Sequence, residues 1–157
     1  MSGSGIIVVF DSMEEDTMSE SASGSAAGFR IHHTMLPVAD LDSSIAFYTR
    51  LLGMQVMGQR TDETRQVKVC HVGYGDRATQ PSIELTQPLG AQARAAVRSF
   101  GGHVAIHLTG LRELCAVMEK EGVKFAQPLK LGGPGGRNLV TFVLDPDGHE
   151  LELVERA

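Results

Sequence analysis

The amino-acid sequence predicts an α+β protein made of two tandem βαβββ modules. The first observation behind this prediction is an internal repeat, in which five positions recur 68 to 70 residues later with the same or a similar residue type. The second is that each half reads as one strand, one amphipathic helix and three further strands. A fixed period of this length indicates that one supersecondary unit was duplicated. The paired positions are His33 and His103, Leu41 and Leu111, Ile45 and Cys115, Gly53 and Gly122, and Glu84 and Glu152.

The first module begins with an expected strand over Arg30–Leu36 that contains a histidine. A helix is expected over Leu41–Leu52, because apolar residues recur there with a 3.6-residue period. Asp40 or Asp42 is a suitable N-cap, and Gly53 is a suitable stop. The three following strands are expected near Met54–Gln59, Gln66–Gly73 and Ser82–Gln87.

The second module repeats this order. A strand over His103–Leu108 precedes a helix over Leu111–Glu121, which Gly122 ends. A turn at 145–148, Asp-Pro-Asp-Gly, joins the last two strands. The three strands after the helix are expected near Phe125, over Leu139–Leu144 and over Glu150–Glu155.

These elements divide the chain into four segments. Residues 1–28 form an extension, 29–87 the first module, 88–100 a linker with a short helical turn, and 101–157 the second module. The extension is rich in Ser and Gly and is expected to be mostly disordered. An extra strand at a sheet edge and an upstream translation artefact are its alternatives.

Composition excludes several classes of function. With 14 Lys and Arg against 19 Asp and Glu, the net charge is -5, which argues against nucleic acid as a partner. No apolar run approaches the roughly 20 residues of a membrane helix. The two cysteines, Cys70 and Cys115, lack CxxC spacing and are too few for a cysteine zinc site. We therefore expect a soluble cytoplasmic protein.

Each module carries one His on its first strand and one Glu on its last. A single strand His or Glu is usually structural or exposed, but the symmetric recurrence of both favours a shared site. If a pseudo-twofold axis relates the modules, two imidazoles and two carboxylates converge on one point. This set suits a divalent transition metal with two positions left open for water or substrate. The predicted ligands are His33, Glu84, His103 and Glu152.

Around these residues the sequence resembles glyoxalase I, the lactoylglutathione lyase of the vicinal oxygen chelate superfamily. The resemblance covers Phe29–Glu155 and implies a cupped mixed sheet, a homodimer with sites across the subunit interface, and the same four metal ligands. The matching stretches are His33-Thr34-Met35-Leu36, Ser44-Ile45-Ala46-Phe47-Tyr48, Leu52-Gly53-Met54, Val72-Gly73-Tyr74-Gly75, Ile83-Glu84-Leu85-Thr86, Gly102-His103-Val104-Ala105 and Asp145-Pro146-Asp147-Gly148 through Glu152.

The resemblance also implies a reaction. A hemithioacetal of methylglyoxal and glutathione becomes a 2-hydroxyacyl thioester through an enediolate that the metal stabilises. Glu152 is assigned as the catalytic base, with Glu84 the counterpart base for the opposite enantiomer. In its short length the chain resembles the nickel- or cobalt-activated members of the glyoxalase I family. The metal is therefore expected to be Ni or Co, with Zn, Mn or Fe as alternatives.

Three positions depart from the family at its glutathione contacts. Pro37 stands where the family usually has an Arg, and Gln87 and Pro88 stand where it has an aromatic residue and an Asn. Proline cannot pair with a carboxylate or donate a side-chain hydrogen bond. Lys130 and Arg137, which flank a Gly-rich loop at 132–136, are candidate substrate-binding replacements. An ordinary exposed hairpin is the alternative for that loop.

The sequence contains four further histidines besides the two predicted ligands. His32 is expected to point away from His33, and His71 and His149, which have no symmetric partner, are expected to be structural or exposed. His107 shares a strand face with the predicted ligand His103, but a core or solvent role is favoured for it.

Two other functions remain open at this point. One is another metal-enolate enzyme of the superfamily, an epimerase or isomerase of a substrate other than a glutathione adduct. The other is a ligand-sequestering protein without catalysis.

Overall fold

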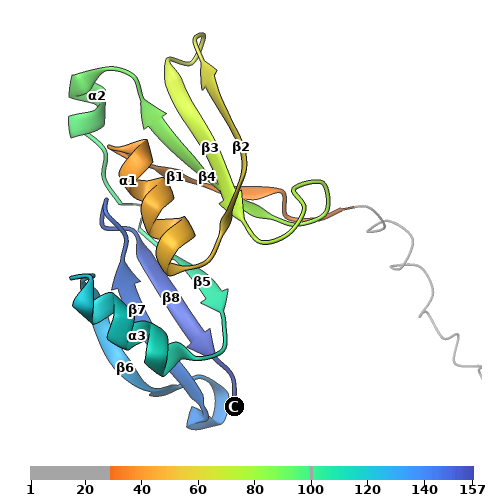
Figure 1. Cartoon of the computed structure of the whole chain (residues 1–157), viewed down its shortest axis with the longest axis vertical. Helices are drawn as coiled ribbons and strands as arrows, with labels where there is room; N and C mark the ends of the chain where they lie inside the picture. Colours follow the sequence, from red (N-terminus) through yellow and green to blue (C-terminus); the bar gives the residue numbers. More distant parts are fainter. Residues whose placement is uncertain (1–28, 100) are drawn as a thin grey trace, which may run out of the picture. The chain divides into compact units, whose positions relative to one another are not determined.

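A computed structural model describes residues 29–99 and 101–157, so the predicted extension 1–28 lies outside the described residues. Residues Ile31–Ala157 form one compact unit. This unit contains two four-stranded mixed sheets with the same strand order, β1-β4-β3-β2 and β5-β8-β7-β6 (Figure 1). The duplicated βαβββ architecture predicted from the repeat is therefore confirmed, while the segment boundaries remain a prediction.

In both sheets the first strand of the module pairs parallel to the last, and all other pairings are antiparallel. The first sheet consists of β1 (His33–Pro37), β2 (Gln55–Asp62), β3 (Val67–Gly73) and β4 (Ser82–Pro88). The second sheet consists of β5 (His103–His107), β6 (Phe125–Gly132), β7 (Asn138–Leu144) and β8 (Glu150–Glu155).

The helix of the first module changes type along its length. It begins as α1 (Leu41–Ala46) and continues as a π-helix over Phe47–Leu51. The hydroxyl of Thr49 donates to the Ile45 carbonyl at 2.7 Å, and such side-chain bonds to the i−4 carbonyl compete with the backbone ladder. The predicted span of the helix is thus confirmed, but its last turns are wider than an α-helix.

Local signals account for the ends of the helices. Asp40 is the N-cap of α1, and its side chain accepts from the Ser43 N–H at 2.8 Å. Gly53 and Gly122 follow the two main helices with φ of +65° and +74°, the left-handed conformation that glycine adopts without a Cβ clash. The second module contains α3 (Leu111–Lys120), and the linker contains α2 (Ala91–Ala95).

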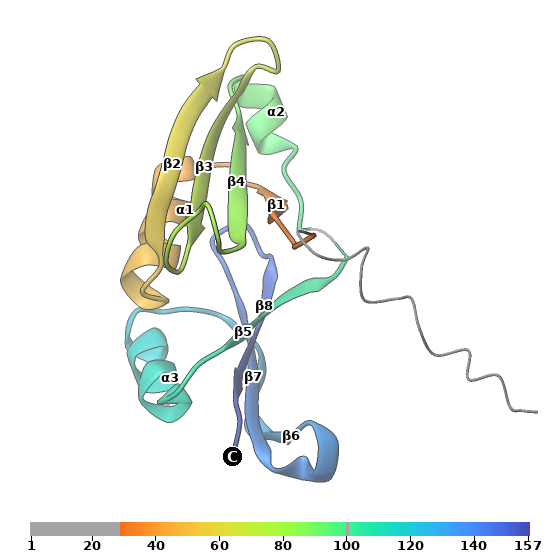
Figure 2. The ribbon, with the colours of Figure 1, turned by 90° about the vertical axis from the view of Figure 1, so that its right-hand side faces the viewer.

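One face of each sheet packs against a helix through apolar side chains, and the other carries the polar residues discussed below. α1 packs against β3 and β4, and α3 packs against β8 (Figure 2). The core beneath the helices is apolar and is shared by both modules; its members include Leu36, Tyr48, Val72, Leu85, Leu111, Met118, Leu151 and Leu153. Burial of this apolar surface is the main stabilising contribution to the fold.

A turn of the second module bonds to the first module. The Tyr48 hydroxyl donates to Asp145 Oδ2 at 2.9 Å, and the Ala39 N–H donates to Asp147 Oδ1 at 3.0 Å. The His149 ring Nε2 lies 2.7 Å from the Pro37 carbonyl oxygen, and His149 is fully buried. The structural role expected for His149 is therefore what the structure shows.

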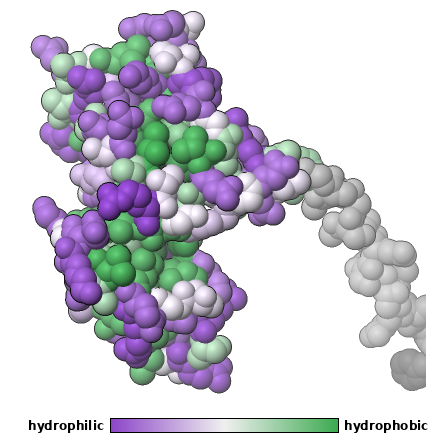
Figure 3. Space-filling view, viewed as in Figure 1, coloured by the Kyte–Doolittle hydropathy of each residue, from purple (hydrophilic) through white to green (hydrophobic). Residues whose placement is uncertain are grey.

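On the face shown in Figure 3, the surface carries hydrophobic patches among hydrophilic residues. Among residues 29–99 and 101–157, no helix has the length and apolar character needed to cross a membrane. Cys70 and Cys115 are both buried free thiols.

Candidate metal centre

His33, His71 and Glu84 lie on one face of the first sheet. His71 on β3 is directly opposite Glu84 on β4, and directly opposed residues point to the same face. Met35 on β1 is also opposite Glu84, so His33, two residues before Met35, shares that face. Both imidazoles consequently approach one carboxylate oxygen: Nε2 of His71 is 3.2 Å and Nε2 of His33 is 3.8 Å from Oε2 of Glu84.

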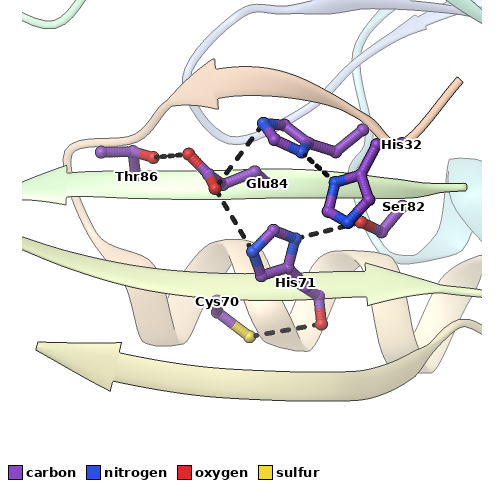
Figure 4. A network of polar contacts seen from close by, with 7 residues as sticks. His32, Cys70, His71, Ser82, Glu84 and Thr86 are labelled. Atoms are coloured by element: carbon purple, nitrogen blue, oxygen red, sulfur yellow. Dashed lines mark hydrogen bonds and ion pairs between the residues drawn. The ribbon is translucent and has the colours of Figure 1, made fainter. Parts of the chain in front are cut away.

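Polar neighbours hold this group in place (Figure 4). The Ser82 hydroxyl lies 3.0 Å from Nδ1 of His71, and the Thr86 hydroxyl donates to Oε1 of Glu84 at 3.3 Å. Only 6% of Glu84 is exposed, and a buried carboxylate requires donors or a cation. Burial, followed by the nearby cation of Arg77, lowers the pKa of His71 against the opposing effect of Glu84. The ring is therefore neutral at neutral pH, the state in which imidazole binds metals.

His103 and Glu152 form the corresponding pair of the second module. Nε2 of His103 lies 3.1 Å from Oε2 of Glu152, with side-chain exposures of 46% and 25%. The register repeats that of the first module, since Ala105 on β5 is opposite Glu152 just as Met35 is opposite Glu84. On β7, however, Phe142 is opposite Glu152, so the position equivalent to His71 is a hydrocarbon ring.

The four predicted ligands are thus brought together as two pairs. Among the described residues, one group of three has its ligand atoms within 4.8 Å of one another, and it consists of His33, His71 and Glu84. His103 and Glu152 do not belong to that group. The convergence of all four residues on one metal stays a prediction, as does the subunit interface at which the resemblance places the site.

The structure adds detail on two of the other histidines. His71, for which the sequence predicts a structural or exposed position, is buried against Glu84. His32 was expected to point away from His33, yet their Nδ1 atoms lie 2.7 Å apart. The reason is that β1 begins at His33 rather than at Arg30, so the alternation of strand residues does not extend to His32. One of the two Nδ1 atoms must donate, which orients the His33 ring.

Gln87, one of the three positions that depart from the family, has a structural role. Gln87 on β4 is buried, and its Oε1 accepts from the Leu41 N–H at 2.7 Å, at the start of α1. Glu155 on β8 does the same for α3, accepting from the N–H groups of Gly110 and Leu111 at 3.0 Å each. These backbone hydrogen bonds lower the pKa of Glu155. Gln87 and Glu155 are 68 residues apart, like Glu84 and Glu152, so the repeat itself contained a signal for this capping pair.

Lys130 and Arg137 lie away from both His–Glu pairs in the sheet order. Lys130 is on β6, the edge strand two positions from β8, and its Nζ donates to Gln127 Oε1 at 2.7 Å. Arg137 follows the short 3₁₀ turn at Pro134–Gly136 and is exposed. Their role in substrate binding stays a prediction.

Two βαβββ units with a His–Glu pair at equivalent register positions define a protein of the vicinal oxygen chelate fold. The chain belongs to the Glyoxalase/Bleomycin resistance protein/Dioxygenase superfamily, whose family model matches residues 30–153. Proteins named lactoylglutathione lyase are similar to it. The one from Salmonella typhimurium is 38% identical over 131 residues, covering 80% of this chain and 92% of that protein. The one from Neisseria meningitidis serogroup A is 31% identical and covers 81% and 91%.

Solved structures of glyoxalase I are similar as well. The Leishmania major enzyme, described as trypanothione-dependent, is 35% identical with a TM-score of 0.64, covering 81% of this chain and 86% of that one. The Zea mays enzyme is 29% identical with a TM-score of 0.70, covering 82% of this chain and 45% of that one. The chain is accordingly a lyase of the glyoxalase I type, as the resemblance in the sequence implied, and not a module without catalysis.

Proposed function

We propose that this protein is a divalent-metal-dependent lactoylglutathione lyase acting on the hemithioacetal of a 2-oxoaldehyde, of the methylglyoxal type, and a thiol. The product is the 2-hydroxyacyl thioester, and the role is detoxification of the oxoaldehyde. The observation that carries the proposal is the pair of His–Glu contacts, at 3.8 Å and 3.1 Å, at equivalent positions of two duplicated sheets. Imidazole nitrogen with carboxylate oxygen is a donor set for Ni, Co, Zn, Mn or Fe.

We further propose a homodimer in which the first module of one protomer faces the second module of its partner. Each protomer then contributes His33 and Glu84 to one site and His103 and Glu152 to the other. The proposal is supported by the group of described ligand residues within 4.8 Å of one another, which holds His33 and Glu84 but neither His103 nor Glu152. A twofold arrangement completes both sites at once, because each interface residue of one copy meets its counterpart on the other.

When bound, the metal supplies Lewis-acid stabilisation of the oxygen that becomes negative as the C–H proton leaves. Glu152 is the proposed base: it takes the proton from C1 of the hemithioacetal and returns it to C2, so no oxidant or reductant is needed. Its side chain is 25% exposed, whereas Glu84 is 8% exposed and is held by His71 and Thr86. We therefore propose that the Glu152 carboxylate moves to take the proton, while the Glu84 carboxylate stays in place as a ligand.

A hollow beside β5 offers room for the small oxoaldehyde portion. It has a volume of ≈ 490 Å³, and His103 lies on its wall. The rest of its lining is mainly apolar, including Val72, Ile83, Val104 and Ile106. Such a wall excludes water from a carbanion-like transition state.

Two of the positions that depart from the family favour a second candidate function, in which the thiol is not glutathione. The Pro37 side chain has no donor or charge to offer glutathione, and Oε1 of Gln87 already accepts from the Leu41 N–H at the start of α1. This observation favours a metal-enolate isomerase or epimerase with a different thiol or none. Lys130 and Arg137 are the proposed anchors if glutathione is the thiol, and K130A and R137A then raise KM with little change in kcat.

The test is isomerisation of methylglyoxal plus glutathione by chelator-treated protein, with Ni, Co, Zn, Mn or Fe restored in turn. We expect metal-dependent turnover that Glu152→Gln lowers by at least about 100-fold. Glu119→Gln is the matched control, because Glu119 is an exposed carboxylate on α3. Stoichiometric metal binding without turnover on glutathione or trypanothione adducts would select the second candidate.

A further inference from the structure

The two half-sites differ at one position, where His71 and Phe142 are equivalent. Each lies on the third strand of its module, directly opposite the Glu of the pair. Each also meets the His of its own pair edge to face, with centroid distances of 5.5 Å for His33 and His71 and 5.4 Å for His103 and Phe142. An aromatic ring at this place therefore serves packing in both modules, and only in the first module does it carry ring nitrogens.

Packing alone does not explain an imidazole at this position. The side chain of His71 is only 3% exposed, and both ring nitrogens have polar neighbours, Ser82 Oγ at 3.0 Å and Glu84 Oε2 at 3.2 Å. A buried polar ring costs free energy that a phenyl ring would not, unless its nitrogens are bound. Ser82 at Nδ1 also orients the ring so that Nε2 faces Glu84, as outer neighbours orient metal-binding histidines.

We propose that His71 is a metal ligand, so that His33, His71 and Glu84 together hold a divalent transition metal within one protomer. This inference rests on the proposed metal site and adds a ligand to it. The geometry supports it because metal–nitrogen bonds of about 2.0–2.1 Å place neighbouring donors about 3 Å apart and opposite donors about 4 Å apart. The separations of 3.2 Å for His71–Glu84 and 3.8 Å for His33–Glu84 are close to these values, and all three ligand atoms lie within 4.8 Å of one another.

The extra ligand makes the two half-sites unequal. The first module binds the metal with three residues, and the second module of the partner adds His103 and Glu152. With a third imidazole the site favours nickel, cobalt or zinc over manganese, because imidazole suits the former and oxygen ligands suit the latter. With three ligands from one protomer, the first module would hold the metal without needing Glu152, which would leave that carboxylate free to act as the base.

The first test is X-ray absorption of the nickel-loaded, full-length wild-type protein, which counts coordinated imidazoles. We expect three in the wild type and two in His71→Phe. Phe is chosen because Phe142 shows that the ring fits the equivalent place. A hydrogen-bonding role for His71 alone predicts two imidazoles in both proteins, and that result would overturn the inference.

The second test is nickel affinity, measured by competition with a chromophoric chelator. His71→Phe should weaken binding by more than about 100-fold, beyond the 10–100-fold typical of an outer neighbour, whereas Ser82→Ala, which keeps the ring, should weaken it by only about 10-fold. Unchanged affinity in a His71→Phe protein whose circular dichroism matches the wild type would refute the ligand assignment. No nickel binding by the wild type would instead refute the metal site of the proposed function. Metal-dependent turnover with two imidazoles would leave that function standing and reject only His71.

Discussion

Removing the hydrogen bond between Tyr48 and Asp145, by Tyr48→Phe, should lower the free energy of unfolding. Both residues are buried, at 0% and 4% exposure, and the bond connects the π-helix of the first module to the turn of the second. Oδ1 of Asp145 already accepts from two backbone N–H groups, those of Asp147 and His149. In Tyr48→Phe, Oδ2 loses the Tyr48 donor and no water can replace it without opening the core.

The expected cost is about 1.5–3 kcal/mol, the range for a hydrogen bond to a charged group. For a chain of this size that corresponds to a decrease in Tm of roughly 3–12 °C, at about 2–4 °C per kcal/mol. Burial raises the pKa of Asp145 above its ordinary value of 3.8, so the folded protein binds that proton more readily than the unfolded chain. Loss of the Tyr48 donor raises this pKa further. The destabilisation is therefore largest at pH 8 and shrinks as the pH falls.

The assay is urea unfolding at fixed protein concentration, at pH 8 and at pH 5, because association contributes to apparent stability. Tyr74→Phe is the matched control: its hydroxyl donates to the Leu52 carbonyl at 2.7 Å, but Tyr74 is 47% exposed and the acceptor is neutral. We expect a cost of about 1 kcal/mol or less there, without pH dependence. A Tyr48→Phe protein within ~0.5 kcal/mol of wild type at pH 8, or one whose deficit grows on acidification, would refute the reasoning.

Three further predictions concern single residues. Glu155→Gln should weaken the N-terminus of α3 and lower Tm at pH 7. The pKa of Glu155 in the folded protein is below its ordinary value of 4.5, so the stability that its carboxylate supplies is present above that pH. The difference in Tm from the wild type should therefore disappear as the pH falls below it. Gly122→Ala should cost about 1 kcal/mol in urea unfolding, since φ is +74° while nothing crowds an added Cβ, and Gly122→Asn should cost less. Cys70 and Cys115 should react with a thiol reagent only after denaturation, because burial raises the pKa of both thiols; fast labelling of the native protein would contradict this.

The architecture was predictable because its signals are periodic and local. The 3.6-residue period of the helices, the glycines after them and the 68–70-residue repeat each depend on neighbouring residues or on duplication. Asp40 was predictable as a cap for the same reason, since its partner is three residues away. The pairs His33–Glu84 and His103–Glu152 were found because duplication preserved both members, and the structure places each pair in contact.

The remaining features depend on which residues of different strands are opposite one another. His71 lies beside Glu84 because of its register, and the repeat gave no sign of this because Phe142 stands at the equivalent position. His32 lies outside the strand alternation because β1 starts at His33. The π-helix over Phe47–Leu51 was not visible in the helical period, although the Thr49 hydroxyl bonds to the Ile45 carbonyl there.

By itself, the sequence determined the duplicated βαβββ fold, the buried faces and the two His–Glu pairs, because strand and helix periodicity decide which side chains share a face. Only the tertiary structure decided that His71 stands beside Glu84 and that Gln87 and Glu155 accept hydrogen bonds from the first N–H groups of α1 and α3. The physical reason is that register and packing bring together residues far apart in the chain, and no local period records which of them meet.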